Sequence, residues 1–230
     1  GQRINMKKHT LVDLGMSGIF HDIGKSCIPL EILNKPSSFN DEEWKVMKRH
    51  PILGVKELLR LKGVDVLTAR IMTGAFEHHM YFNLSGYPKV PYNKKVSLLG
   101  SIISIADFYD ALASSRVYKR SPSPPDDVLK FMISRSGTYY DPVLVKIFVN
   151  CIGIYPLGSL CYLTTGELAV VMENNPDPEK WERPKVRIVS DRDGREVEGR
   201  VADLDNPREG RGIARTVDAE KYGIDVSRYF

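Results

Sequence analysis

Hydrophobic positions recur at helical spacing as far as about residue 152, and short alternating runs separated by turn residues follow. Two of the helical segments carry an inward row at i, i+4 spacing that includes a polar side chain, His78 in one and Asp107 in the other. The pattern predicts one helix that stops near Gly24, a second from Asp41 to the His50-Pro51 break, and further helices over residues 53–61, 64–79, 96–113, 126–135 and 142–152.

Local signals support several of these helix ends. Ser38 or Asn40 can cap the helix that starts at residue 41, and Trp44 belongs to its predicted buried side. Asp141 before a proline is typical of a helix start, and Gly24 is typical of a helix stop.

The last part of the chain has the pattern of a β domain. Runs at residues 160–163, 168–172, 186–189 and 197–204 predict strands, with turns at Thr165-Gly166 and Asp193-Gly194. About 75 residues of short strands favour a small barrel or sandwich. The predicted fold class is therefore mainly α, with an all-helical domain at 1–153 and a small all-β domain, barrel- or sandwich-like, at 154–230.

Composition narrows the class of protein. Hydrophobic residues make up 42% of the 230 residues, which is enough for a packed core, and the net charge of +4 is too small for a nucleic-acid-binding stripe. The three cysteines form no CxxC pair, which argues against a disulfide framework or a zinc ribbon. No apolar run is long enough for a membrane span, and the start lacks a signal-peptide core. We expect a cytoplasmic protein with no DNA or RNA partner and no direct membrane insertion.

Histidines supply the candidate chemistry. Four of the five lie beside another ligand type or a helix break, as His21-Asp22, His50-Pro51 and His78-His79. A lone inward histidine is usually a hydrogen-bonded core residue, and a lone inward aspartate such as Asp107 is usually capped or ion-paired. Together, however, mixed nitrogen and oxygen donors without cysteine favour divalent ions such as iron or manganese. Two ions sharing a carboxylate would provide a hydroxide nucleophile and hold a phosphodiester.

In this order and spacing, the motifs resemble the HD-GYP subgroup of the HD-domain phosphohydrolases, which hydrolyse the bacterial messenger cyclic di-GMP. An HD pair alone would be a weak signal, whereas the ordered set is specific. The matching segments are His21-Asp22-Ile23-Gly24-Lys25 (HDxGK), His50-Pro51-Ile52-Leu53-Gly54 (HPxxG), His78-His79, Gly86-Tyr87-Pro88, and Ile105 to Leu112 (ADxYDAL) followed by Arg116, Tyr118 and Lys119.

The resemblance implies an HD-type helical domain and a role for each matching residue. It implies that Asp22 bridges two divalent ions, that Lys25 faces the scissile phosphate, and that Arg116 and Lys119 hold phosphate oxygens. Without the motif, that basic pair would be read as a solvated patch. The implied metal ligands are His21, Asp22, His50, His78, His79 and Asp107, and the implied catalytic residues are Asp22 and Lys25. The implied loop at the pocket mouth, also a docking surface for diguanylate cyclase (GGDEF) domains, is Gly86, Tyr87 and Pro88, a tripeptide that alone would be a surface turn.

Two departures from the family pattern carry expectations of their own. Met80, Asn83 and Leu84 replace the usual Glu and Asp-Gly, which predicts poorer orientation of the metal ligands and about 10–100-fold lower metal affinity or activity unless Glu77 substitutes. The chain also begins after the position of the family's upstream helix with its Glu and His. We therefore expect an N-terminally incomplete helical domain whose second ion, at His21 and Asp107, lacks one ligand.

Three functions follow from these residues. The first is metal-dependent hydrolysis of cyclic di-GMP to linear pGpG and then GMP. The second, motivated by Met80, Asn83 and Leu84, is a catalytically impaired receptor or adaptor that binds cyclic di-GMP or a diguanylate cyclase without turnover. The third is phosphohydrolysis of another nucleotide. The resemblance also favours a homodimer.

Overall fold

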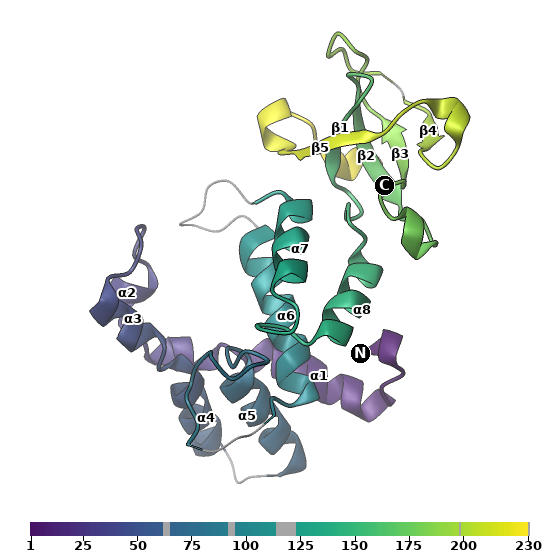
Figure 1. Cartoon of the computed structure of the whole chain (residues 1–230). Helices are drawn as coiled ribbons and strands as arrows, with labels where there is room; N and C mark the ends of the chain where they lie inside the picture. The colour runs from purple at the N-terminus through teal and green to yellow at the C-terminus, as the bar shows by residue number, and fades with distance from the viewer. Residues whose placement is uncertain (62–64, 92–94, 114–122, 198, 230) are drawn as a thin grey trace. The chain divides into compact units, whose positions relative to one another are not determined.

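The structure is a computed structural model, and it describes all residues except 62–64, 92–94, 114–122, 198 and 230. The chain divides into two compact units (Figure 1). Of the described residues, the helical unit contains 1–111 and 132–147, and the sheet unit contains 112–113, 123–131 and 148–229. The predicted domain boundary at residue 153 stays a prediction.

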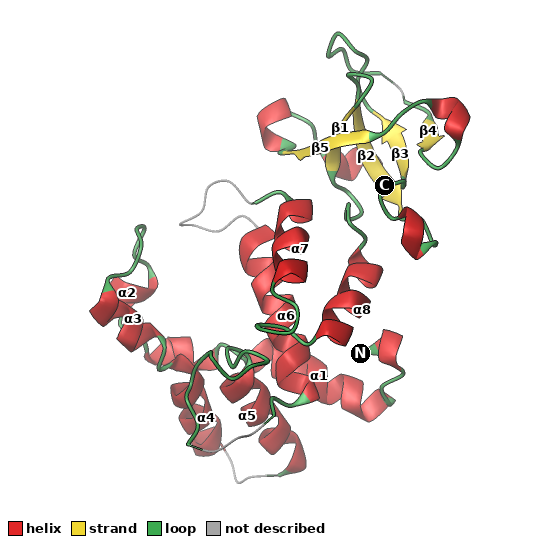
Figure 2. Ribbon diagram, in the orientation of Figure 1, coloured by secondary structure: helices red, strands yellow, loops and turns green. Residues whose placement is uncertain are grey.

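The predicted helices are present, and their starts follow local chemistry (Figure 2). Asn40 and Glu43 form a reciprocal capping box at one helix start, and Asp141 accepts hydrogen bonds from two backbone N–H groups at another. The bounds are η1 Gln2–Ile4, α1 Lys8–Phe20, η2 Ile23–Cys27, α2 Leu30–Leu33, α3 Asp41–Met47, α4 His50–Leu61, α5 Val66–Glu77, α6 Leu98–Ala113, α7 Pro125–Ser134 and α8 Pro142–Ile152.

Two features expected from the composition, the lack of a membrane-spanning helix and the lack of disulfides, can be compared with the structure. Of the helices that the structure describes, none combines the length and apolar character of a bilayer span. The three cysteines, Cys27, Cys151 and Cys161, are free thiols.

Packing of α1, α4 and α5 brings distant parts of the chain together. Leu58, Ile71 and Ala75 are buried, and Phe20 and Met16 from α1 pack against them. Close to this core, the Ser17 hydroxyl donates to the backbone carbonyls of Asp13 and Arg70, and those two residues also form an ion pair. The C-terminal ends of α1 and α5 are therefore tied to the same core as α4.

The prediction that Gly24 stops a helix is wrong. Helix α1 ends at Phe20, and Gly24 lies within the 3-10 turn η2 without a positive φ. A Cβ atom at Gly24 would lie 2.0 Å from the carbonyl oxygen of His50 and 2.4 Å from the backbone nitrogen of Gly54. The glycine is needed because η2 and the first turn of α4 approach at backbone distance.

The sheet unit contains one antiparallel sheet in the order β4-β3-β2-β1-β5. Three predicted strands are present within one or two residues, the run at 197–204 forms only a short strand, and the strand at 213–217 was missed. Closure into a barrel or sandwich stays a prediction. The bounds are β1 Leu160–Leu163, β2 Leu168–Glu173, β3 Lys185–Ile188, β4 Val201–Asp203 and β5 Ile213–Val217, with 3-10 turns η3 Pro178–Lys180, η4 Pro207–Glu209, η5 Glu220–Tyr222 and η6 Val226–Tyr229.

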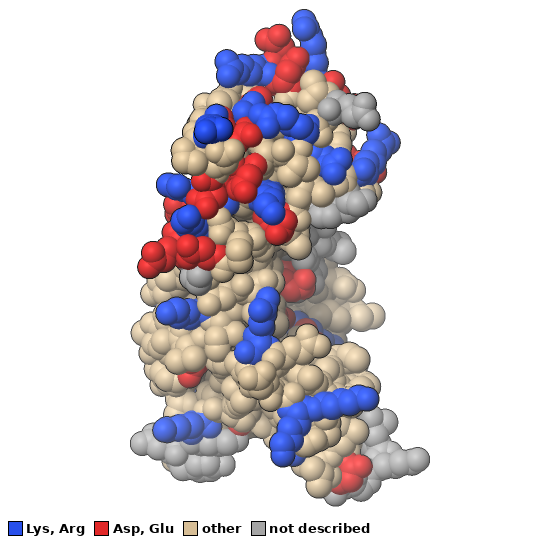
Figure 3. Space-filling view, turned by 90° about the vertical axis from the view of Figure 1, so that its right-hand side faces the viewer, with Lys and Arg blue, Asp and Glu red and all other residues tan. Residues whose placement is uncertain are grey.

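An ionic network fastens the end of the sheet. Arg211 binds both carboxylate oxygens of Glu167 at 2.8 Å, and it also donates to the carboxylate of Glu209 at 2.9 Å. Arg200 in turn binds both oxygens of Glu209. Figure 3 shows acidic and basic side chains of the sheet unit as neighbours on the face in view, in keeping with the small net charge.

We predict a pH-dependent contribution to stability from Glu167. The hydrogen bond from Arg211 lowers the pKa of Glu167 from 4.5 to about 2. Its ion pair therefore stabilises the fold fully above about pH 4.5, and this contribution is lost as the pH falls toward 2. Glu167→Gln should lower the free energy of unfolding at pH 7 by about 2 kcal/mol, and the difference from wild type should vanish near pH 2.

Urea unfolding over a pH series measures this difference. Glu173→Gln is the matched control, because Glu173 is 61% exposed and its ion pair with Lys185 lies in solvent. Equal losses in the two variants at pH 7 would contradict the role assigned to Glu167.

Candidate metal centre

Six side chains singled out by spacing lie within reach of one another, although they come from four separate segments of the helical unit. The packing of α1, α4 and α5 brings three of these segments together, and α6 supplies the fourth. The six are His21 and Asp22 after α1, His50 at the first residue of α4, His78 and His79 after α5, and Asp107 within α6.

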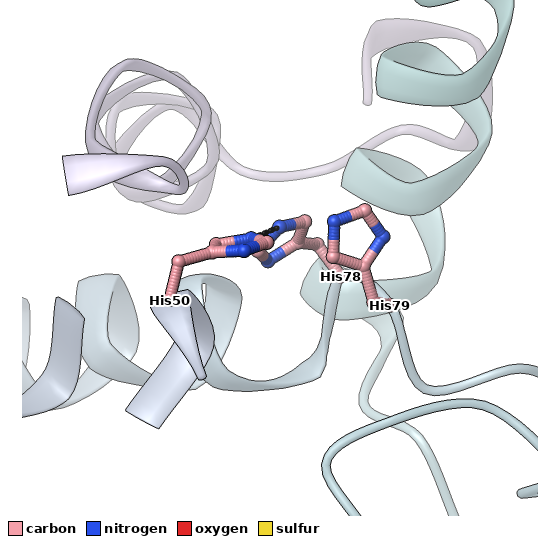
Figure 4. A group of neighbouring side chains, drawn as sticks. All are labelled: His50, His78 and His79. Atoms are coloured by element: carbon pink, nitrogen blue, oxygen red, sulfur yellow. Dashed lines mark hydrogen bonds between the residues drawn. The ribbon is translucent and has the colours of Figure 1, made fainter. Parts of the chain in front are cut away.

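His50 and His78 face each other through their Nε2 atoms. The Nδ1 atom of His50 lies 2.8 Å from the carbonyl oxygen of Met47, and that of His78 lies 2.9 Å from the carbonyl oxygen of Ala75. Because a carbonyl oxygen only accepts, each Nδ1 must donate, and each neutral ring then carries its lone pair on Nε2. The two Nε2 atoms, joined by the dashed line in Figure 4, are 3.1 Å apart. Two facing lone pairs repel each other, and a cation between them removes the repulsion.

Asp22 lies between this histidine pair and a second group. Its Oδ1 atom is 3.4 Å from Nε2 of His50 and 3.7 Å from Nε2 of His78, and its Oδ2 atom is 3.3 Å from Nε2 of His21. The Oδ2 atom also accepts a 2.5 Å hydrogen bond from Nζ of Lys25. The two oxygens of one carboxylate thus face two different sets of nitrogen donors.

Two overlapping clusters offer ligand atoms within 4.8 Å of one another, His50-His78-His79 and His21-Asp22-His78. Asp107 adjoins the second cluster, with its Oδ1 atom 3.5 Å from Nε2 of His21. Within the described part of the chain, Oδ1 of Asp22 is buried without a hydrogen-bond partner, and Nε2 of His21 has only its two long contacts with carboxylate oxygens. Buried polar atoms are rarely left unpaired, so the donor set fits divalent cations.

Burial keeps three of the imidazoles neutral. It lowers the pKa of His50, and together with neighbouring imidazoles it lowers the pKa of His78 to about 4 and that of His79 to about 2. These rings are therefore unprotonated at neutral pH and have lone pairs to offer to a metal.

His21 is the exception. Burial lowers its pKa, but the carboxylates of Asp107 and Asp22 outweigh burial and raise the pKa to about 10. Burial alone would raise the pKa of both carboxyls, yet the His21 side chain, together with Lys25 at Asp22, holds these pKa values below their usual range. The His21 imidazolium therefore balances the charge of the two carboxylates.

A pocket of about 760 Å³ opens beside these residues. It is lined by Lys25, His50, His79 and Asp107, together with Tyr87. The volume suits a nucleotide-sized ligand, and Lys25 places one cationic group in the wall.

The Gly86-Tyr87-Pro88 tripeptide folds back onto the paired histidines. The Tyr87 ring lies 4.7 Å from the His79 ring, and the Tyr87 N–H donates to the His79 carbonyl oxygen at 2.9 Å. A Cβ atom at Gly86 would lie 2.0 Å from that same oxygen, and the Tyr87-Pro88 bond is cis. The tyrosine ring is therefore part of the pocket wall. Arg116 and Lys119 lie outside the described residues.

A family model described as an HD domain matches residues 1–144. The chain belongs to the HD-domain family. Relatives named as cyclic di-GMP phosphodiesterases, together with the Gly86-Tyr87-Pro88 tripeptide, identify it as an HD-GYP member.

Three of these bacterial relatives show how much of each chain the similarity covers. One from Pseudomonas aeruginosa is 35% identical over 163 residues, which cover 71% of this chain and 38% of the relative. One from Vibrio cholerae is 37% identical over 58% of this chain and 27% of the relative, and one from Thermotoga maritima is 35% identical over 60% and 39%. The aligned region thus spans well under half of each of these relatives.

The residues that depart from the HD-GYP family pattern occupy defined places in the structure. Met80 is a core residue, 3% exposed, and Leu84 adopts φ of +62°, a conformation that favours the glycine of the family pattern. The Oε2 atom of Glu77 accepts from the backbone N–H of Ser97, next to the start of α6. Its expected substitution for the missing glutamate stays a prediction. Orientation of His50 and His78 comes from backbone carbonyl oxygens.

The pocket also contains side chains that the sequence did not identify. Trp44, predicted on the buried side of its helix, is 41% exposed and lines the pocket with Phe39. The prediction for Trp44 is wrong because its face of α3 borders the pocket rather than the core. Hydrophobic periodicity identifies an apolar helix face but cannot distinguish a core from a pocket.

We predict that Gly24→Ala destabilises the HD-GYP chain by about 3 kcal/mol and lowers its metal content. The added methyl group would push against the His50 carbonyl oxygen and displace the first turn of α4. Urea unfolding and elemental analysis measure the two effects.

Gly15→Ala is the matched control, because Gly15 lies in α1 and a Cβ atom there meets nothing within 4 Å. This control should gain about 0.5–1 kcal/mol from helix propensity. A Gly24→Ala protein as stable as the control would refute the close approach of η2 to α4.

Proposed function

We propose that this HD-GYP chain is a metal-dependent phosphodiesterase that hydrolyses cyclic di-GMP to linear pGpG and then to GMP. The observation that carries the proposal is the convergence of two Nε2 lone pairs, from His50 and His78, on an unpartnered oxygen of Asp22. The names of the relatives supply the substrate class.

The residues present fit two divalent ions, and we propose iron or manganese. His50, His78, His79 and one oxygen of Asp22 would hold one ion, and His21, Asp107 and the other oxygen of Asp22 would hold the second. When bound, such ions supply Lewis acidity and lower the pKa of water.

Lys25 would bind and orient the substrate phosphate. Its Nζ is held by Asp22 and lines the pocket beside His50, so a diester in the pocket would meet a fixed positive charge. That charge would stabilise the negative charge that develops on the phosphate oxygens. We assign Arg116 and Lys119 to further phosphate contacts and the Gly86-Tyr87-Pro88 loop to docking of GGDEF domains, and we propose a homodimer.

Two alternatives have specific support. The buried Met80 in place of the family's glutamate favours an adaptor that binds without turnover. Two other Vibrio cholerae relatives, 33% and 31% identical, are named as 3'3'-cGAMP-specific phosphodiesterases, which favours another cyclic dinucleotide. A panel of cyclic di-GMP, 3'3'-cGAMP and cyclic di-AMP distinguishes these substrates.

We predict that the purified chain loaded with Fe²⁺ or Mn²⁺ produces linear pGpG, and that His78→Ala lowers the rate and the metal affinity by about 100-fold. The substitution removes a lone pair from the centre of the ligand set. Chromatography of the products and elemental analysis measure the two effects.

His9→Ala controls for loss of a histidine elsewhere, because His9 is exposed on α1. It should leave both values unchanged. Bound metal and bound cyclic di-GMP without any product would reject hydrolysis in favour of the adaptor, and a preference for a different dinucleotide would reject the substrate.

A further inference from the structure

The pocket beside the histidines has a lining of two chemical kinds. One part consists of the polar groups of the metal centre and Lys25. Another is aromatic, with Phe39 from the segment that leads into α3 and Trp44 within α3, and Ser37 and Ser38 line the same pocket. Both kinds line one continuous pocket, so a ligand whose phosphate meets Lys25 can extend toward the aromatic side chains.

Trp44 is held in a defined position although it is exposed. The Phe39 ring lies 5.5 Å from it at 86°, and Nζ of Lys48 lies 5.6 Å from the ring centre. The preceding turn is fixed as well, because Glu43 closes the capping box with Asn40 and binds Lys35 through both carboxylate oxygens. A large indole that is 41% exposed, yet fixed from several sides, is typical of a binding surface rather than of a core residue.

We propose that Trp44 is a substrate-binding residue that contacts a nucleobase of the bound dinucleotide. This inference rests on the proposed function, and it extends that function from the phosphate to the base. A purine presents a flat π-face for contact with aromatic side chains and polar edges for hydroxyl groups. The indole of Trp44 supplies the first kind of contact, and the serines at 37 and 38 supply the second.

Steady-state kinetics on the metal-loaded full chain test the inference first. Trp44→Ala should raise KM for cyclic di-GMP about tenfold or more, the range expected for loss of a base contact, and should leave kcat within about threefold. Trp44→Phe, which keeps an aromatic face, should restore most of the affinity. Trp181→Ala, the same change in the sheet unit, should behave as wild type.

Fluorescence tests contact without turnover. The chain has two tryptophans, so Trp181→Phe leaves Trp44 as the sole indole fluorophore. GMP contains no diester bond to hydrolyse, and its titration with excitation at a wavelength that guanine does not absorb should quench this variant. The same titration should leave Trp44→Phe unquenched.

The failures are distinguishable. A wild-type chain that does not hydrolyse cyclic di-GMP overturns the proposed function whether or not it binds the dinucleotide, and the GMP titration then still tests the base contact. A wild-type chain that hydrolyses it, together with a Trp44→Ala chain whose KM stays within twofold and an unquenched Trp181→Phe chain, overturns only the base contact. A rise in KM with Trp44→Phe equal to that with Trp44→Ala also rejects the aromatic contact.

Discussion

The site depends on one electrostatic constraint, the convergence of lone pairs that have no proton between them. His50 and His78 each spend their only N–H on a backbone carbonyl, so their Nε2 atoms meet as acceptors beside a carboxylate oxygen. Such an arrangement is unfavourable in the absence of a cation, and it persists because the surrounding helices fix the rings. The candidate site therefore lies where these acceptor atoms converge.

The rest of the helical unit holds these side chains in position. The core between α1, α4 and α5 sets where His50 and His78 lie, and the glycine contact between η2 and α4 sets how near Asp22 comes to them. His21 provides a proton's charge between two carboxylates, which limits the cost of burying them. Helix packing thus sets the positions of the ligand side chains, and the charge of His21 limits the cost of burying the carboxylates among them.

Sequence reasoning predicted the helices well because caps and periodicity are local, as at Asn40 and Asp141. It also grouped the six metal-ligand candidates, because five of them stand in pairs or beside a helix break and Asp107 lies on an otherwise apolar inward row. It failed where a tertiary contact decides the outcome. Gly24 is a contact residue rather than a helix stop, and Trp44 faces a pocket rather than the core. Neither distinction is encoded in the spacing of neighbouring residues along the chain.

One shared feature of the histidines concerns how their rings are aligned. His21, His50 and His78 each bond through Nδ1 to the carbonyl oxygen three residues earlier, at Gly18, Met47 and Ala75. A backbone carbonyl oxygen is present whichever side chain a residue carries. The alignment of these rings therefore does not depend on the side chain of another residue. The alignment of these three imidazoles therefore needs no acidic side chain at position 80.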